Sequence, residues 1–85
     1  KTREGKDRLH GRLYPNPGGE TLTIDIPQPG LRLIMSEISG SIRLSRNLEN
    51  KHNSMPVSTL PTGMYFFRIV NENNEAICVG KWIKL

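Results

Sequence analysis

The residue types that could perform catalysis in this 85-residue sequence are two histidines, a few carboxylates and one cysteine. His10 lies in a charged leader and His52 in a polar, asparagine-rich segment, and neither is linked by its spacing to a nucleophile. We interpret both histidines as exposed. Two paired carboxyl groups could act as a general acid and a general base, but the carboxylates after the leader are scattered over predicted turns and outer strand faces: Glu20, Asp25, Glu37, Glu49, Glu72 and Glu75. The pattern predicts a protein that is not an enzyme.

Residues that could bind a metal, a cofactor or a sugar are equally sparse. Cys78 is the only cysteine, which excludes an internal disulfide, and no Cys/His spacing indicates a metal site. Gly18-Gly19 is not followed by a helix, so a phosphate-binding loop would lack the helix N-terminus that it needs. We therefore expect no cofactor. Tyr14 and Trp82 could form an aromatic platform for a sugar ring, but a tryptophan in a last strand is more often a core or rim residue.

The positive charge is concentrated at the start of the chain. Of the formal net charge of +4, residues 1–12 carry +3 and the remainder +1. A nucleic-acid-binding surface combines a basic stripe with aromatic side chains, and no aromatic residue lies among these basic ones. We predict a flexible polar linker over 1–12, one folded domain over 13–85, no nucleic-acid partner and no transmembrane segment.

The elements that must position any site are predicted to be strands, because apolar and polar residues alternate along most of 13–85. Strands are expected at 13–14, 20–26, 31–38, 42–45, 55–60, 64–70 and 76–85, with a loop at 47–54. The core should contain the inward-facing members of the three clearest strands: Leu22, Ile24, Ile26, Leu31, Leu33, Met35, Tyr65, Phe67 and Ile69. The opposite face of 64–70, including Val70, is expected to be partly exposed.

Prolines and glycines set the expected turns. Pro61 and Gly63 favour a chain reversal before the aromatic strand, since one fixes φ and the other tolerates positive φ. Pro56 cannot donate a ladder hydrogen bond, so its strand must lie at a sheet edge or make its hydrogen bonds around that position. Tight connections are expected at 39–41 and 71–74. About seven short strands without a helix predict an all-β antiparallel β-sandwich, with a partly open barrel as the alternative.

Three segments carry a resemblance to a known family. They are Leu13-Tyr14-Pro15-Asn16-Pro17, Leu60-Pro61-Thr62-Gly63-Met64-Tyr65 and Lys81-Trp82-Ile83-Lys84-Leu85. In this order and spacing they resemble the Tyr-Pro-Asn-Pro opening, the Leu-x-x-Gly-x-Tyr pattern and the Lys-aromatic-aliphatic-Lys-aliphatic end of a bacterial signal domain. That domain is the type A C-terminal sorting domain of the type IX secretion system (the Por secretion system family). Gly40 falls where the family has a turn glycine.

The resemblance implies an immunoglobulin-like antiparallel β-sandwich that ends a secreted protein, with residues 1–12 as the linker from an upstream cargo domain. Its partners would be the outer-membrane translocon and the sortase or attachment complex. The parent protein would pass through the periplasm and then reach the cell surface or be secreted. A sortase often cleaves upstream of such domains and attaches the cargo to lipopolysaccharide.

Recognition by the translocon is carried over to five residues: Gly63, Tyr65, Lys81, Lys84 and Leu85. A structural signature is carried over to Tyr14, Pro15, Asn16, Pro17, Gly40 and Leu60. Gly63 and Tyr65 can also be explained by turn geometry and packing alone. Alternation places Lys81 and Lys84 on opposite faces of their strand, so at least one must be exposed. Two alternatives stay open: an immunoglobulin-like binding or adhesion module for carbohydrate or protein, and a retained sorting domain that docks a structural component of the machinery.

Overall fold

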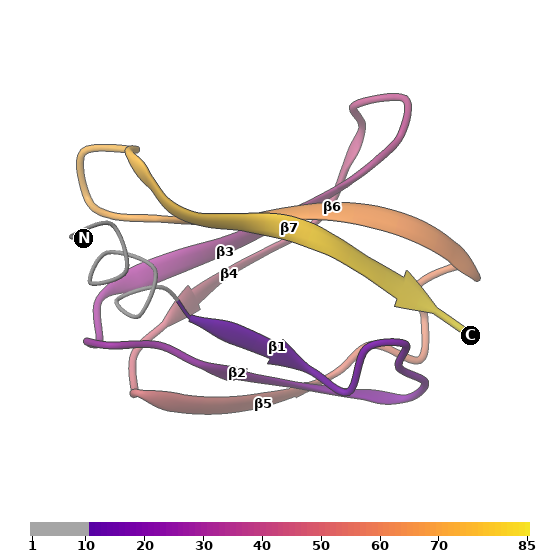
Figure 1. Ribbon diagram of the computed structural model, residues 1–85, viewed down its shortest axis with the longest axis horizontal. Helices are drawn as coiled ribbons and strands as arrows, with labels where there is room; N and C mark the ends of the chain where they lie inside the picture. Colours follow the sequence, from indigo (N-terminus) through magenta and orange to yellow (C-terminus); the bar gives the residue numbers. More distant parts are fainter. Residues whose placement is uncertain (1–10) are drawn as a thin grey trace, which may run out of the picture.

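A computed structural model describes residues 11–85, which form two β-sheets that face each other (Figure 1). The predicted leader, with His10, lies almost entirely outside the described residues. Seven strands follow one another along the chain: β1 (Arg12–Tyr14), β2 (Thr21–Asp25), β3 (Leu31–Glu37), β4 (Ile42–Leu48), β5 (His52–Pro56), β6 (Gly63–Val70) and β7 (Ala76–Lys84). Within 11–85 there is no helix, and hence none able to cross a membrane.

The strand order is that of an immunoglobulin-like sandwich. One sheet has the order β1-β2-β5 and the other β4-β3-β6-β7, and every strand pair is antiparallel. In immunoglobulin-like sandwiches the first, second and fifth strands share a sheet, while the third, sixth and seventh share the other. Here β4 extends the second sheet at its β3 edge. The predicted all-β sandwich is confirmed.

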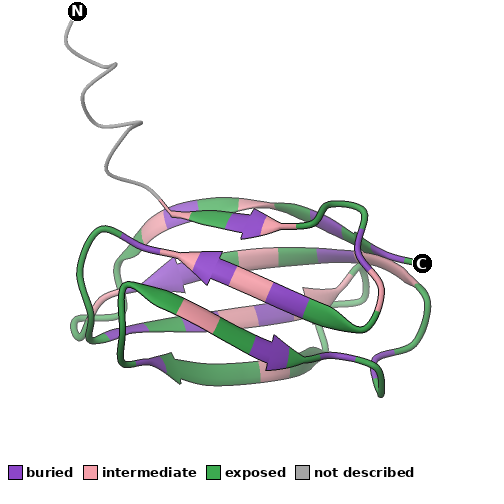
Figure 2. Ribbon diagram, turned by 90° about the horizontal axis from the view of Figure 1, so that it is seen from below, coloured by how far each residue is buried: buried purple, intermediate pink, exposed green. Residues whose placement is uncertain are grey.

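The core lies between the sheets and is built from alternate residues of the strands (Figure 2). Alternating side chains point to opposite faces of a strand, so β2, β3 and β7 bury residues at alternate positions, whereas β4 and β5 each bury one. Eight of the nine predicted core residues are buried, and Phe67 is half-buried. Val70, expected on the partly exposed face, is instead buried. It is not a member of the core cluster between the sheets, and it pairs with the exposed Arg32 of β3.

The predicted loop at 47–54 is wrong at both ends. β4 continues through Leu48, which pairs with Leu31 and is fully buried, and β5 already begins at His52. The polar composition of this segment reflects exposure, because β4 has exposed side chains at most of its positions. Pro56 ends β5, which is an edge strand as predicted.

Candidate recognition site

The start of β6 forms a tyrosine corner. The Tyr65 hydroxyl donates a hydrogen bond to the Pro61 carbonyl, an arrangement that recurs in immunoglobulin-like sandwiches at the entry to the sixth strand. Tyr65 is only 2% exposed, and burial raises the pKa of its hydroxyl. Gly63 adopts φ +150°, a conformation essentially confined to glycine, and Leu60 is buried beside the turn. The Leu-x-x-Gly-x-Tyr pattern therefore fixes this turn to the core.

Replacing Tyr65 with phenylalanine tests the corner bond by itself. The ring would keep its tilted packing against Trp82, whose ring centroid is 6.3 Å away, while the bond to Pro61 would be lost. We expect the free energy of unfolding to fall by about 1 kcal/mol, as for a typical intramolecular hydrogen bond. Chemical denaturation measures it. Tyr65→Leu, which also removes aromatic packing, should cost more; equal stability of wild type and Tyr65→Phe would contradict the assignment.

The opening signature docks on the outer edge of β7. The Asn16 amide nitrogen donates to the Lys81 carbonyl (2.9 Å), and its amide oxygen accepts from the Ile83 amide (3.1 Å). Gly18 then donates its own amide to the Ile83 carbonyl (2.9 Å) and accepts from the Leu85 amide (2.8 Å). An edge strand exposes unpaired backbone groups, and these four bonds satisfy the C-terminal half of the β7 edge. Both X-Pro bonds of the motif, at Pro15 and Pro17, are cis.

Trp82 joins the three signature segments. Its side chain is fully buried, its ring stands beside Tyr65, and its indole nitrogen donates to the Pro15 carbonyl (2.7 Å). A Cβ atom on Gly18 would lie 2.6 Å from the Trp82 ring, so only glycine allows this close approach. A fully buried ring cannot stack on a sugar, so the platform suggested for Tyr14 and Trp82 is wrong.

Tyr14 instead takes part in a polar cluster on the exposed face of the three-stranded sheet. Its hydroxyl donates to Asp25 Oδ2 (2.7 Å), and His52 Nδ1 lies 2.6 Å from Asp25 Oδ1. The Arg12 guanidinium lies 3.7 Å from Asp25 and covers the Tyr14 ring at 4.7 Å. On the same face, the Ser54 hydroxyl is hydrogen-bonded to Thr23, whereas His52 contacts Asp25. The cluster binds β1, β2 and β5 together.

Asp25 gives the domain a predictable pH dependence. The hydrogen bond from Tyr14, followed by that from His52, holds the pKa of Asp25 below its ordinary value of 3.8. A depressed folded-state pKa contributes stability above the unfolded pKa and loses it as pH falls through the folded value. We expect the wild-type melting temperature to fall more steeply below pH 3.8 than that of Asp25→Asn. Thermal unfolding followed against pH checks this, with Glu72→Gln as the control; parallel curves for wild type and Asp25→Asn would contradict it.

The closing segment presents its residues in different environments. Lys81 is exposed on the outer face of β7, and Leu85, just beyond the strand, is 70% exposed. Lys84 lies on the inner face, opposite Gly63, and is only 7% exposed. The expectation that the two lysines face opposite ways is confirmed. Of the five recognition candidates, Lys81 and Leu85 are the most accessible.

The signature residues outside this region have structural positions. Gly40 has φ +99° in the β3–β4 hairpin and donates its amide to the Glu37 carbonyl (2.8 Å). A positive φ is what glycine tolerates best, so the turn accounts for this residue. Two interactions were missed in the sequence: the double hydrogen bond of Asn16 and the packing of Gly18 on Trp82. Both connect residues more than 60 positions apart, and local spacing carries no signal of them.

Comparison with known proteins agrees with this arrangement. The family model described as "Secretion system C-terminal sorting domain" matches residues 12–84. The chain belongs to this family. It is therefore a type IX secretion sorting domain, a member of a family of sorting signals rather than of enzymes, and its class of partner is the type IX secretion machinery. No curated protein and no solved structure matches the chain.

Proposed function

We propose that residues 13–85 are the folded signal by which the type IX translocon carries a parent protein from the periplasm across the outer membrane. The observation that supports this most is that the other two signature segments both contact the closing one, which forms the C-terminal half of β7. The opening segment does so through Pro15 and Asn16, and the turn segment through Tyr65. The opening and turn segments are distant from β7 in sequence, yet both hold Lys81–Leu85 in one conformation. A partner that binds this segment would therefore recognise the folded domain.

The five recognition candidates divide into two roles in this proposal. Lys81 and Leu85 contact the translocon directly, because Lys81 is exposed near the end of β7 and Leu85 is exposed just beyond it. Gly63, Tyr65 and Lys84 are positioning residues, since Tyr65 and Lys84 are buried and Gly63 sets the turn. Sortase cleavage upstream of the domain, with attachment of the cargo to lipopolysaccharide, is part of the same proposal.

Export of a fusion protein tests the proposal. Residues 1–85 are placed behind a periplasmic fluorescent reporter in a host that carries the machinery, and surface fluorescence is measured. Lys81→Glu combined with removal of Leu85 should lower export roughly tenfold, equivalent to about 1.4 kcal/mol of lost binding. Lys51→Glu, an exposed lysine between β4 and β5, is the matched control. A wild-type fusion that stays in the periplasm would contradict the proposal.

Point variants test recognition more specifically than removal of the whole segment 81–85 does. Deleting 81–85 would also remove Trp82, which is fully buried, so loss of export would report on folding as much as on recognition.

Mass spectrometry of the surface form separates two fates of the domain. A cleaved domain is missing from the exported reporter, whereas a retained docking domain is still attached.

A further inference from the structure

Exposed apolar side chains gather on the outer face of the four-stranded sheet. Phe66 from β6 and Val79 and Ile83 from β7 are all exposed there, Val79 at 69%. They lie on neighbouring strands, since Phe66 pairs with Lys81 and Met64 with Ile83. Residues at these positions contribute nothing to the core between the sheets. Such a cluster marks an interaction surface more often than an isolated exposed residue does.

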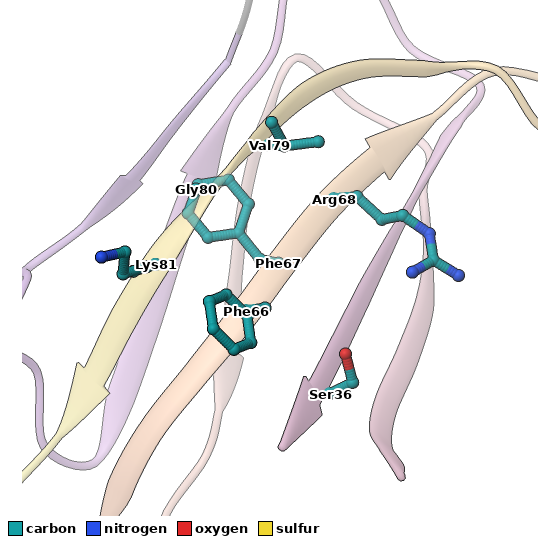
Figure 3. A pocket seen from close by; sticks show the side chains of 7 residues that line it. All are labelled: Ser36, Phe66, Phe67, Arg68, Val79, Gly80 and Lys81. Carbon is teal, nitrogen blue, oxygen red and sulfur yellow. The ribbon is translucent and has the colours of Figure 1, made fainter. Parts of the chain in front are cut away.

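The same face is hollowed between β6 and β7. An open groove of about 310 Å³ is lined at its centre by Phe66, Phe67 and Val79 (Figure 3). Gly80 pairs with Phe67 at core-facing positions of the two strands, where a Cβ atom on Gly80 would lie 2.8 Å from the Phe67 ring. Lys81 and Arg68 also line the groove and extend in opposite directions from it. The groove therefore has an apolar floor between two cations.

The charge on this face has one sign. Arg32, Arg68 and Lys81 occupy outward positions of β3, β6 and β7, and Arg32 reaches Ser45 on β4 (3.5 Å). The outward positions of these strands hold no carboxylate, and no ion pair joins these three cations to another residue of 11–85. The face thus combines an apolar centre with a net positive charge.

We propose that this face is the docking surface for a protein partner that inserts an apolar side chain between Phe66 and Val79 and places carboxylates against Lys81 and Arg68. This inference rests on the proposed function and names the surface used for it. Lys81 belongs both to this face and to the end of β7, so the two contact regions are continuous. A second copy of the chain is disfavoured as the occupant, because its matching face would bring like charges together. The groove also favours a protein partner over a membrane surface, because it can accommodate a side chain of the partner, whereas attraction to anionic lipid requires no groove.

Glutamate substitution on the two sheets tests the proposal within the export assay. Val79→Glu introduces a negative charge at the groove, and Thr21→Glu does so at an exposed strand residue of the other sheet. We expect Val79→Glu to lower surface export roughly tenfold and Thr21→Glu to leave it unchanged. Arg68→Glu should also lower export, with Arg46→Glu as its control. Thermal unfolding verifies that each variant remains folded.

The possible results separate the two proposals. A wild-type fusion that is not exported contradicts the proposed function itself. Export of the wild type together with equal export of Val79→Glu overturns the docking surface and leaves the proposed function standing.

Crosslinking identifies the class of occupant. A photoreactive p-benzoylphenylalanine at position 79 should form an adduct with a protein of the secretion machinery at an acidic peptide, and one at position 21 should not. Co-flotation of the domain with phosphatidylglycerol vesicles that is lost in Val79→Glu, without a protein adduct, would overturn the proposal in favour of a membrane surface.

Discussion

Replacing Trp82 with alanine is expected to remove about 3–5 kcal/mol from the free energy of unfolding, as for other large-to-small changes of buried aromatic residues. Trp82 is fully buried and is the largest of the fully buried side chains. Small domains have unfolding free energies near the lower end of about 5–15 kcal/mol, so this one change removes much of the total. We expect about 0–2 kcal/mol to remain, so that a measurable fraction of the domain is unfolded at 37 °C.

The effect should extend beyond the core, because the indole nitrogen also holds the Pro15 carbonyl. Trp82→Phe is the matched control, since it keeps an aromatic ring and loses the hydrogen bond. Its cost should be clearly smaller than that of Trp82→Ala. Circular dichroism during urea denaturation measures both variants. A Trp82→Ala domain within about 1 kcal/mol of wild type would show that the ring is not the centre of this core.

How far the fold could be predicted differs between its strands. Strands in which apolar and polar residues alternate, such as 20–26 and 64–70, were predicted correctly because one face of each is buried. The second half of β4 and the start of β5 were missed, since exposed side chains on both faces leave the backbone pairing with no hydrophobic pattern. Leu48 was the single apolar signal in that segment, and it is fully buried. Alternation likewise does not show the burial of Val70, which lies outside the core cluster.

The candidate site could be predicted only as separate motifs. The sequence indicated that Lys81 and Lys84 lie on opposite faces of their strand, because alternation is a local property of a strand. It did not indicate which of Lys81 and Lys84 is exposed, since that depends on which face of β7 meets the other sheet. The groove beside Val79 also depends on pairing, because Val79 lies opposite Arg68 only in the observed register. The pairing of strands that are distant in sequence therefore determines which lysine is exposed and where the groove forms, and the local sequence pattern does not.

Replacing Asn16 with alanine is expected to detach the opening signature from the end of β7. The change removes both side-chain bonds to β7, to the Lys81 carbonyl and from the Ile83 amide. At about 0.5–1.5 kcal/mol for each bond, we expect a loss of about 1–3 kcal/mol of unfolding free energy. Asn16→Asp should cost less than Asn16→Ala, because a carboxylate cannot donate to the Lys81 carbonyl but can still accept from the Ile83 amide.

Hydrogen exchange separates local detachment from global destabilisation. If Asn16 holds the edge, the Ile83 amide should exchange faster in Asn16→Ala by more than the global loss of stability explains, while the amides that join β6 to β7 keep their relative protection. Ser54→Ala, which removes a side-chain bond on the far sheet, should leave the Ile83 amide unaffected beyond its global effect. In the export assay the detached end of β7 should reduce surface delivery although the sandwich stays folded. Normal export with an unprotected Ile83 amide would mean that the translocon does not require the conformation that Asn16 imposes on Lys81–Leu85.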